Sequence, residues 1–206
     1  RYIAEYADQL ALSTLKQRLA ALANWHQSNG FPDPTKASKV RQLLKGIRAV
    51  HPVQQKQAAP LALLHLEKAV AHLEDEVAQA RAAGNMAALL KATRDIALVT
   101  IGFWRGFRGD ELARLSIENT HAERYVGIRF YLGSSKGDRQ NIGREYKTPS
   151  LNKLCPVEAY LNWIEVAGLT CGGVFRGIDR WGNISDRPIA AHSLIPLLRD
   201  TLNRCG

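Results

Sequence analysis

The chain has 206 residues, of which 46% are hydrophobic and 23% are charged, and it carries a net charge of +9. This composition is typical of a folded protein, and no run approaches the roughly 20 apolar residues that cross a bilayer. The three cysteines lack the Cys-x-x-Cys spacing of a zinc site, so we expect no zinc site.

The positive charge is concentrated in the N-terminal part of the chain. Residues 1–60 hold nine Lys and Arg against three Asp and Glu, whereas residues 61–206 hold nineteen against sixteen. A basic segment joined to a nearly neutral one indicates a polyanion-binding module joined to a part with another task. The sequence starts at Arg1 with no methionine and no signal-peptide pattern. We therefore expect a fragment of a cytoplasmic protein with no membrane partner.

Two helices are predicted in the basic segment. Leucines at 12, 15, 19 and 22 recur at the spacing of one helix face, and Pro32 and Pro34 prevent this helix from continuing. A second helix begins near Lys36, with Val40, Leu43, Leu44, Ile47 and Val50 facing inward. Its other face is basic and is either a solvated surface or a surface laid against DNA phosphates. The candidate DNA-binding residues there are Lys39, Arg41, Lys45 and Arg48.

A linker separates this segment from a second helical region. Residues 51–60 contain two prolines, three glutamines and no apolar period, which predicts a helical DNA-binding domain over 1–55 and a second domain over 56–206. Leu63, Leu66, Val70, Leu73 and Val77 predict one helix after the linker, and residues 86–104 predict another. The run 95–104 is apolar on most sides, so we expect it to be buried.

The hydrophobic period then changes from helix to strand. Val126, Ile128, Phe130 and Leu132 alternate with polar, small or aromatic residues, which predicts a half-buried strand. Residues 134–138, which include Lys136, have turn composition, and residues 143–149 can return as the partner strand. Helices are expected from Pro156 and over 189–204. The predicted fold class is mainly α with a small antiparallel β-sheet.

Arg108 and Lys136 form a pattern suited to phosphodiester chemistry. Arg108 follows the buried helix, within the sequence GFRGDELARL of residues 106–115, and Glu111 lies one helical turn further on. A guanidinium donates parallel hydrogen bonds to phosphate oxygens and keeps its charge. A lysine in a turn can protonate a leaving oxygen when nearby cations lower its pKa. We expect Arg108 to project from the end of the buried helix.

The sequence of residues 106–115, followed by the hairpin lysine, resembles the tyrosine recombinases, the family of phage integrases and Xer-type resolvases. The resemblance implies an N-terminal helical core-binding (SAM-like) domain and a mixed α/β catalytic domain that is C-terminally truncated. It implies a site-specific recombinase or integrase of a mobile element that cleaves and rejoins DNA through a 3′-phosphotyrosyl intermediate, and it implies no metal and no cofactor. Arg108 would hold the scissile phosphate, Glu111 would orient it, and Lys136 would protonate the 5′ oxygen. The implied partners are double-stranded DNA, contacted also by Arg139 and Arg144, and further protomers in a dimer or tetramer.

Two parts of the family pattern are not found in residues 1–206. Ile195 stands where a His-x-x-Arg phrase starting at His192 would need arginine, so we expect the second arginine and the tyrosine nucleophile beyond Gly206, and the fragment alone to be inactive. A non-catalytic DNA-binding protein derived from a recombinase is the alternative. An enzyme acting on a small anionic substrate is disfavoured, because no glycine-rich phosphate-binding loop is present.

Overall fold

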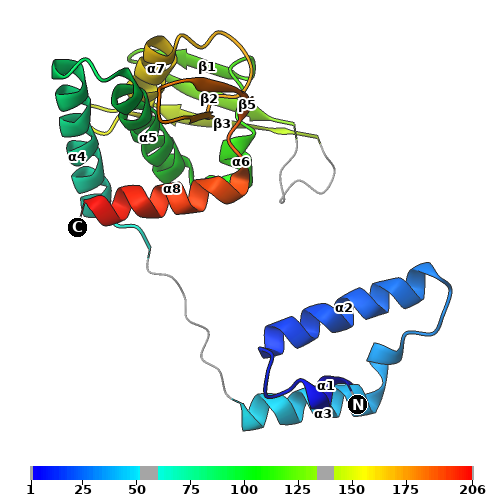
Figure 1. Ribbon diagram of the computed structural model, residues 1–206. Coiled ribbons are helices and arrows are strands. Elements are labelled where there is room, and N and C mark those ends of the chain that lie inside the picture. Colours follow the sequence, from blue (N-terminus) through cyan, green and yellow to red (C-terminus); the bar gives the residue numbers. More distant parts are fainter. Residues whose placement is uncertain (1, 52–59, 134–141, 206) are drawn as a thin grey trace. The chain divides into compact units, whose positions relative to one another are not determined.

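The chain folds into two compact units, residues 1–59 and 60–206 (Figure 1). The computed structural model describes residues 2–51, 60–133 and 142–205. The predicted boundary after residue 55 lies outside the described residues. Among these residues, no helix combines the length and the apolar character needed to cross a membrane.

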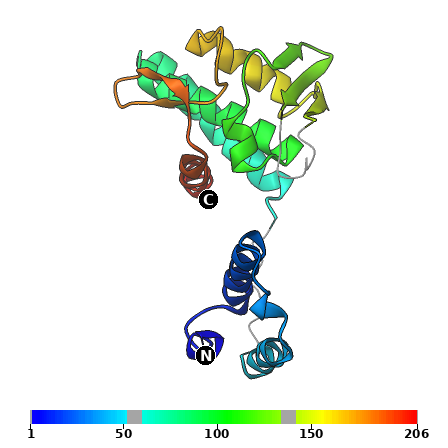
Figure 2. The ribbon, with the colours of Figure 1, turned by 90° about the vertical axis from the view of Figure 1, so that its right-hand side faces the viewer.

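The first unit is entirely helical where the structure describes it (Figures 1 and 2). Its small core contains buried Ile3, Leu15 and Ile47, with partly buried residues of the two longer helices around them. Val50 was predicted to face inward but is 72% exposed, because it is the last residue of its helix, beyond the packed turn of Ile47. The elements are α1 (Tyr2–Glu5), α2 (Leu12–Ser28), the 3-10 helix η1 (Pro34–Lys36) and α3 (Ser38–Val50).

The second unit begins with two packed helices, α4 (Leu63–Ala82) and α5 (Met86–Arg105). The turn between them uses the left-handed backbone of Gly84 and the Asn85 side chain, which accepts a hydrogen bond from the Ala88 N–H at 3.0 Å. Leu66, Val70 and Leu73 of α4 pack on Ala92 and Val99 of α5. Leu63 belongs to the predicted apolar face of this helix, but it is 45% exposed at the first position of α4.

A three-stranded antiparallel sheet in the order β1-β2-β3 packs with α5 and with α7 (Pro156–Ala167). The predicted hairpin is confirmed, since β2 pairs with β3 from Gly127–Pro149 to Leu132–Arg144. Ile128, Phe130 and Leu132 face the core, as the alternation predicted, whereas Val126 precedes β2 and is 64% exposed. The strands are β1 (Thr120–Glu123), β2 (Gly127–Leu132) and β3 (Arg144–Pro149).

The last elements form a two-stranded sheet and a helix. Strands β4 (Arg176–Ile178) and β5 (Ile184–Pro188) pair with each other apart from the larger sheet (Figure 2). Helix α8 (Ala191–Arg204) runs across α5 from the short helix α6 (Gly109–Ala113) to α4 (Figure 1). The fold class predicted from sequence, mainly α with a small antiparallel sheet, is confirmed; the second sheet was not predicted.

A buried ion pair connects α5 to β4. Arg94 and Asp95 are each 4% exposed, and Asp95 Oδ1 accepts from Arg94 Nε at 2.9 Å and lies 2.8 Å from Nη2. Arg94 Nη1 also donates to the Arg176 carbonyl at 3.3 Å. Burial raises the pKa of Asp95, and the adjacent guanidinium opposes that rise. Each charge in this pair therefore depends on its partner.

We predict that Arg94→Met lowers the free energy of unfolding by about 3–5 kcal/mol at pH 7, because Asp95 is left as an unpaired buried charge. This loss of unfolding free energy should become smaller as the pH is lowered from 7 to 5. Removing Arg94 raises the pKa of Asp95 further, so the folded variant takes up a proton that the unfolded chain does not, and its stability rises as the pH falls. Urea unfolding at several pH values measures both effects.

Arg124→Met is the matched control, since Arg124 makes an exposed ion pair with Glu158 at 3.4 Å. Such pairs contribute about 0–1 kcal/mol. A similar small loss for Arg94→Met would contradict the role assigned to the buried pair.

Candidate functional site

Arg108 lies in a sharp turn between α5 and α6, and not at the end of the buried helix as expected. Helix α5 ends at Arg105, and Gly106 reverses the chain in the left-handed conformation with φ 61°. Phe107 then enters the core, and Arg108 becomes the N-cap residue of α6. The sequence placed Arg108 near the correct helix, but the glycine moves it into a new turn.

Glu111 fixes both the backbone and the side chain of Arg108. Its Oε2 accepts a hydrogen bond from the Arg108 backbone N–H at 2.9 Å, and its Oε1 accepts one from Arg108 Nη1 at 3.0 Å. Arg108 cannot return a capping hydrogen bond, because a guanidinium carries donors only. The Glu111 side chain is 6% exposed and that of Arg108 is 60% exposed. One edge of the guanidinium is thus anchored, and the rest can reach an anion from solvent.

The β2–β3 hairpin lies against the turn that carries Arg108. The Phe107 ring contacts the Tyr146 ring of β3, with centroids 5.1 Å apart, and the Phe130 ring of β2, at 5.6 Å. Arg144 begins β3 and is exposed. Lys136 and Arg139, the other hairpin candidates, lie outside the described residues. The structure therefore brings Arg144 and the base of the hairpin to the Arg108 turn.

The first residue of helix α8 lies close to the turn that carries Arg108. A Cβ atom added to Gly109 would lie 3.7 Å from the Ala191 carbonyl at the start of α8. His192 is the second residue of this helix, and Ile195 is 54% exposed on it. No residue of α8 that the structure describes makes a hydrogen bond or ion pair with Arg108.

The four basic candidates on α3 are all exposed. Arg41, Lys45 and Arg48 are four and three residues apart, so they share one side of the helix, whereas Lys39 lies on another side. Among the described residues, none of the four makes an ion pair. This line of three cations is open to a polyanion.

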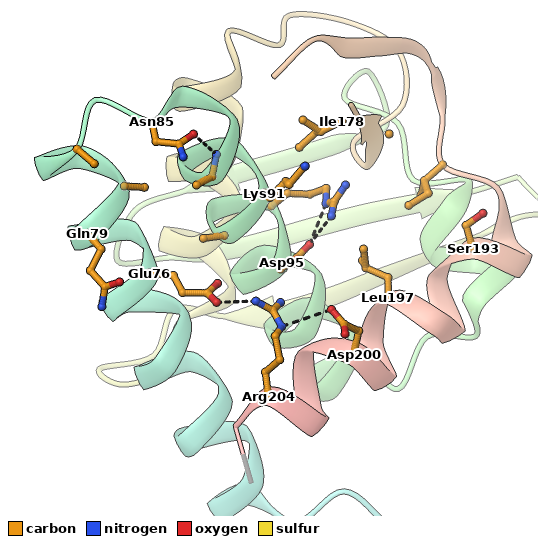
Figure 3. Close-up of a pocket in the computed structure, with 17 residues that line it drawn as sticks. Glu76, Gln79, Asn85, Lys91, Asp95, Ile178, Ser193, Leu197, Asp200 and Arg204 are labelled. Carbon is orange, nitrogen blue, oxygen red and sulfur yellow. Dashed lines mark hydrogen bonds and ion pairs between the residues drawn. The ribbon is translucent and has the colours of Figure 1, made fainter. Parts of the chain in front are cut away.

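Sequence reasoning missed a cavity of about 800 Å³ that is lined by α4, α5, β4 and α8 (Figure 3). Its charged groups are largely paired with one another: Arg204 bonds Glu76, Arg204 Nε lies 3.4 Å from Asp200, and Asp95 pairs with Arg94 (Figure 3). These residues are spread from position 76 to position 204, so no local sequence pattern announces them. The charges on the walls of this cavity pair with one another, whereas the guanidinium of Arg108 is exposed and can bind an anion.

We predict that Glu111→Gln lowers the free energy of unfolding by about 1–2 kcal/mol, because the amide has one accepting oxygen where the carboxylate has two. Urea unfolding measures the change. Glu158→Gln serves as the control and should change stability by about 0–1 kcal/mol, since Glu158 pairs with Arg124 in solvent. Equal effects of the two substitutions would show that the Arg108 turn does not depend on Glu111.

Comparison with known proteins relates the chain to a described protein but to no known family model. No model of a known protein family matches the chain. The chain is 26% identical over 210 residues to a protein described as an integrase/recombinase xerD homolog from Selenomonas ruminantium. The alignment covers 100% of this chain and 58% of that protein. The chain therefore spans a little over half the length of the relative that it matches.

Proposed function

Because the chain is related to the tyrosine recombinases, we propose that it is part of a DNA recombinase in which Arg108 binds the scissile phosphate. The observation that carries this proposal is the geometry of Arg108, whose guanidinium is anchored by a buried carboxylate on one side and open on the other. An arginine fixed in this way is preorganised for charge that develops on a phosphorus centre.

The proposed reaction cleaves and rejoins DNA strands without a metal or cofactor. A tyrosine hydroxyl loses its proton as its oxygen attacks phosphorus and forms a 3′-phosphotyrosyl bond; the bond to the 5′ oxygen breaks, and that oxygen takes a proton. Rejoining is the reverse step, in which a 5′ hydroxyl attacks phosphorus and the tyrosine leaves and regains its proton. Arg108 stabilises the negative charge on the non-bridging oxygens through charge-assisted hydrogen bonds. Lys136, proposed from its place in the hairpin sequence, supplies the proton to the 5′ oxygen.

The attacking tyrosine is not assigned to any tyrosine of residues 1–206. Tyr160 is buried, and burial raises its pKa to about 12, so it is a poor source of phenolate. Tyr146 is enclosed by the Phe107 ring and two guanidinium groups, so it packs the hairpin base. A nucleophile outside this chain is part of the proposal, consistent with the greater length of the relative.

The basic side of α3 is proposed as a second DNA contact. Arg41, Lys45 and Arg48 form an exposed line of cations on the first unit, and each phosphate that they neutralise releases counterions. Lys39, on another side of α3, and Arg139 and Arg144, in the hairpin sequence, complete the proposed DNA-binding residues. Self-association as a dimer or tetramer on DNA is proposed from the relation to recombinases alone.

We predict that Arg108→Ala in the full-length protein slows formation of the covalent protein–DNA complex by on the order of 10²–10³-fold, because one preorganised donor group is lost. The assay uses duplex DNA that carries a target selected from a randomised library and counts complexes that survive denaturing electrophoresis. Lys153→Gln, which removes an exposed cation before α7, should leave the rate unchanged. A normal rate for Arg108→Ala would exclude the assignment.

We also predict that replacing Lys45 and Arg48 together with Gln reduces the slope of log affinity against log salt by about two for duplex DNA, since each lost phosphate contact contributes about 0.9. Fluorescence anisotropy over a salt series measures the slope. Replacing Lys68 and Arg81, which are exposed on α4, provides a control of equal charge change. An unchanged slope for the α3 variant would place the DNA elsewhere.

A further inference from the structure

Two arginines from distant parts of the second unit meet at the ring of Tyr146. The Cζ atom of Arg105, the last residue of α5, lies 5.3 Å from the ring centroid. The Cζ atom of Arg144, the first residue of β3, lies 5.6 Å from the same centroid. Both distances are within the range of cation–π attraction, in which arginine is the more frequent partner of aromatic rings. Tyr146 thus brings together two positive charges that would otherwise repel each other.

Neither of these two arginines has a carboxylate partner among the described residues. The nearby carboxylates are engaged elsewhere: Glu145 lies 2.8 Å from Lys147 Nζ and 3.9 Å from Arg129 Nη1, and Glu111 bonds Arg108. The hydrogen bond from Lys147 is the main cause that lowers the pKa of Glu145, so this carboxylate is committed to that partner. In the part of the chain that the structure describes, no carboxylate therefore compensates the positive charge at Tyr146.

Arg105 also has hydrogen-bonding capacity to spare. Its Nη1 donates to the Lys147 carbonyl at 2.8 Å, which fixes the side chain along β3. Its Nε is buried and has no acceptor among the residues that the structure describes. A buried donor without an acceptor destabilises the fold. The Lys147 carbonyl accepts from only one of the guanidinium nitrogens, Nη1. The guanidinium of Arg105 is thus held in place, but not all of its hydrogen-bond donors have an acceptor among the described residues.

The pair lies beside Arg108. Arg105 precedes Arg108 by three residues, and Phe107, between them, packs against the same Tyr146 ring. The α5–α6 turn and β3, which meet where Phe107 packs on Tyr146, therefore carry three guanidinium groups, Arg105, Arg108 and Arg144. Only Arg108 has a carboxylate partner there, again among the described residues.

We propose that Arg105 and Arg144 bind the DNA backbone phosphates that flank the one bound by Arg108, with Tyr146 positioning both guanidinium groups. This inference rests on the proposed function, since it takes duplex DNA as the ligand. Phosphodiesters suit the site because they offer several acceptor oxygens and neutralise the uncompensated charge. The contacts carry no base specificity and set the register of the backbone relative to Arg108.

The test compares duplex DNA binding by the chain and its variants over a salt series, with thermal unfolding recorded for each. Arg105→Gln and Arg144→Gln should each weaken binding about 5-fold at low salt and reduce the log–log salt slope by about one, and the double variant by about two. Tyr146→Leu should weaken binding although it removes no charge, and Tyr146→Phe, which keeps the ring, should recover most of that loss. Arg124→Gln removes an exposed arginine that pairs with Glu158 and is the control.

The outcomes separate the two proposals. If the unmodified chain does not bind duplex DNA, the proposed function fails. If it binds and Arg108→Ala reduces the slope while the Arg105 and Arg144 variants match Arg124→Gln, only this inference is overturned. Arg144 is exposed at a strand end, so Arg144→Gln decides the question even if Arg105→Gln lowers the unfolding temperature. A loss for Tyr146→Phe as large as for Tyr146→Leu would exclude the positioning role of the ring.

Discussion

The contact between Glu111 and Arg108 is the constraint on which the chemistry of this structure depends. A carboxylate whose side chain is 6% exposed must be hydrogen-bonded to be tolerated. Glu111 achieves this by accepting from the backbone and the side chain of one residue. The same two bonds start α6, set the direction of Arg108 and leave its outer edge in solvent. Packing of Phe107 against β2 and β3 then fixes this turn relative to the hairpin.

The second unit uses charge in two different ways. Arg94 and Asp95 satisfy each other inside the protein and tie α5 to β4, and the walls of the adjacent cavity pair their own charges. Around Tyr146, in contrast, the described residues hold arginines by contact with the aromatic ring and by a backbone carbonyl, and not by carboxylates. Paired charges stabilise a fold, whereas a preorganised cluster of unpaired cations favours an anionic ligand.

Much of this fold could be predicted from sequence because the helices and the hairpin have strong hydrophobic periods. The alternation through Ile128, Phe130 and Leu132 predicted the strand face correctly. Predictions failed at helix ends, where Val50 and Leu63 follow the period but lie beyond the packed surface. In the sequence, Gly106 was interpreted only as part of a motif. In the structure, its left-handed turn ends α5 and places Arg108 after the helix. The contact of Arg105 with Tyr146 depends on tertiary packing, and no local pattern reveals it. Arg144 and Tyr146, in contrast, are two residues apart and share one face of β3.

The most direct test of the central assignment uses DNA in which a methylphosphonate, which is uncharged, replaces the scissile phosphate. If Arg108 binds that phosphate, Arg108→Ala should weaken binding of normal DNA by about 10-fold, as expected for the loss of a charged hydrogen bond. The same substitution should have almost no effect with the methylphosphonate DNA, because the two changes remove one shared interaction. Equal losses on both DNAs would contradict the account and place Arg108 away from the scissile phosphate.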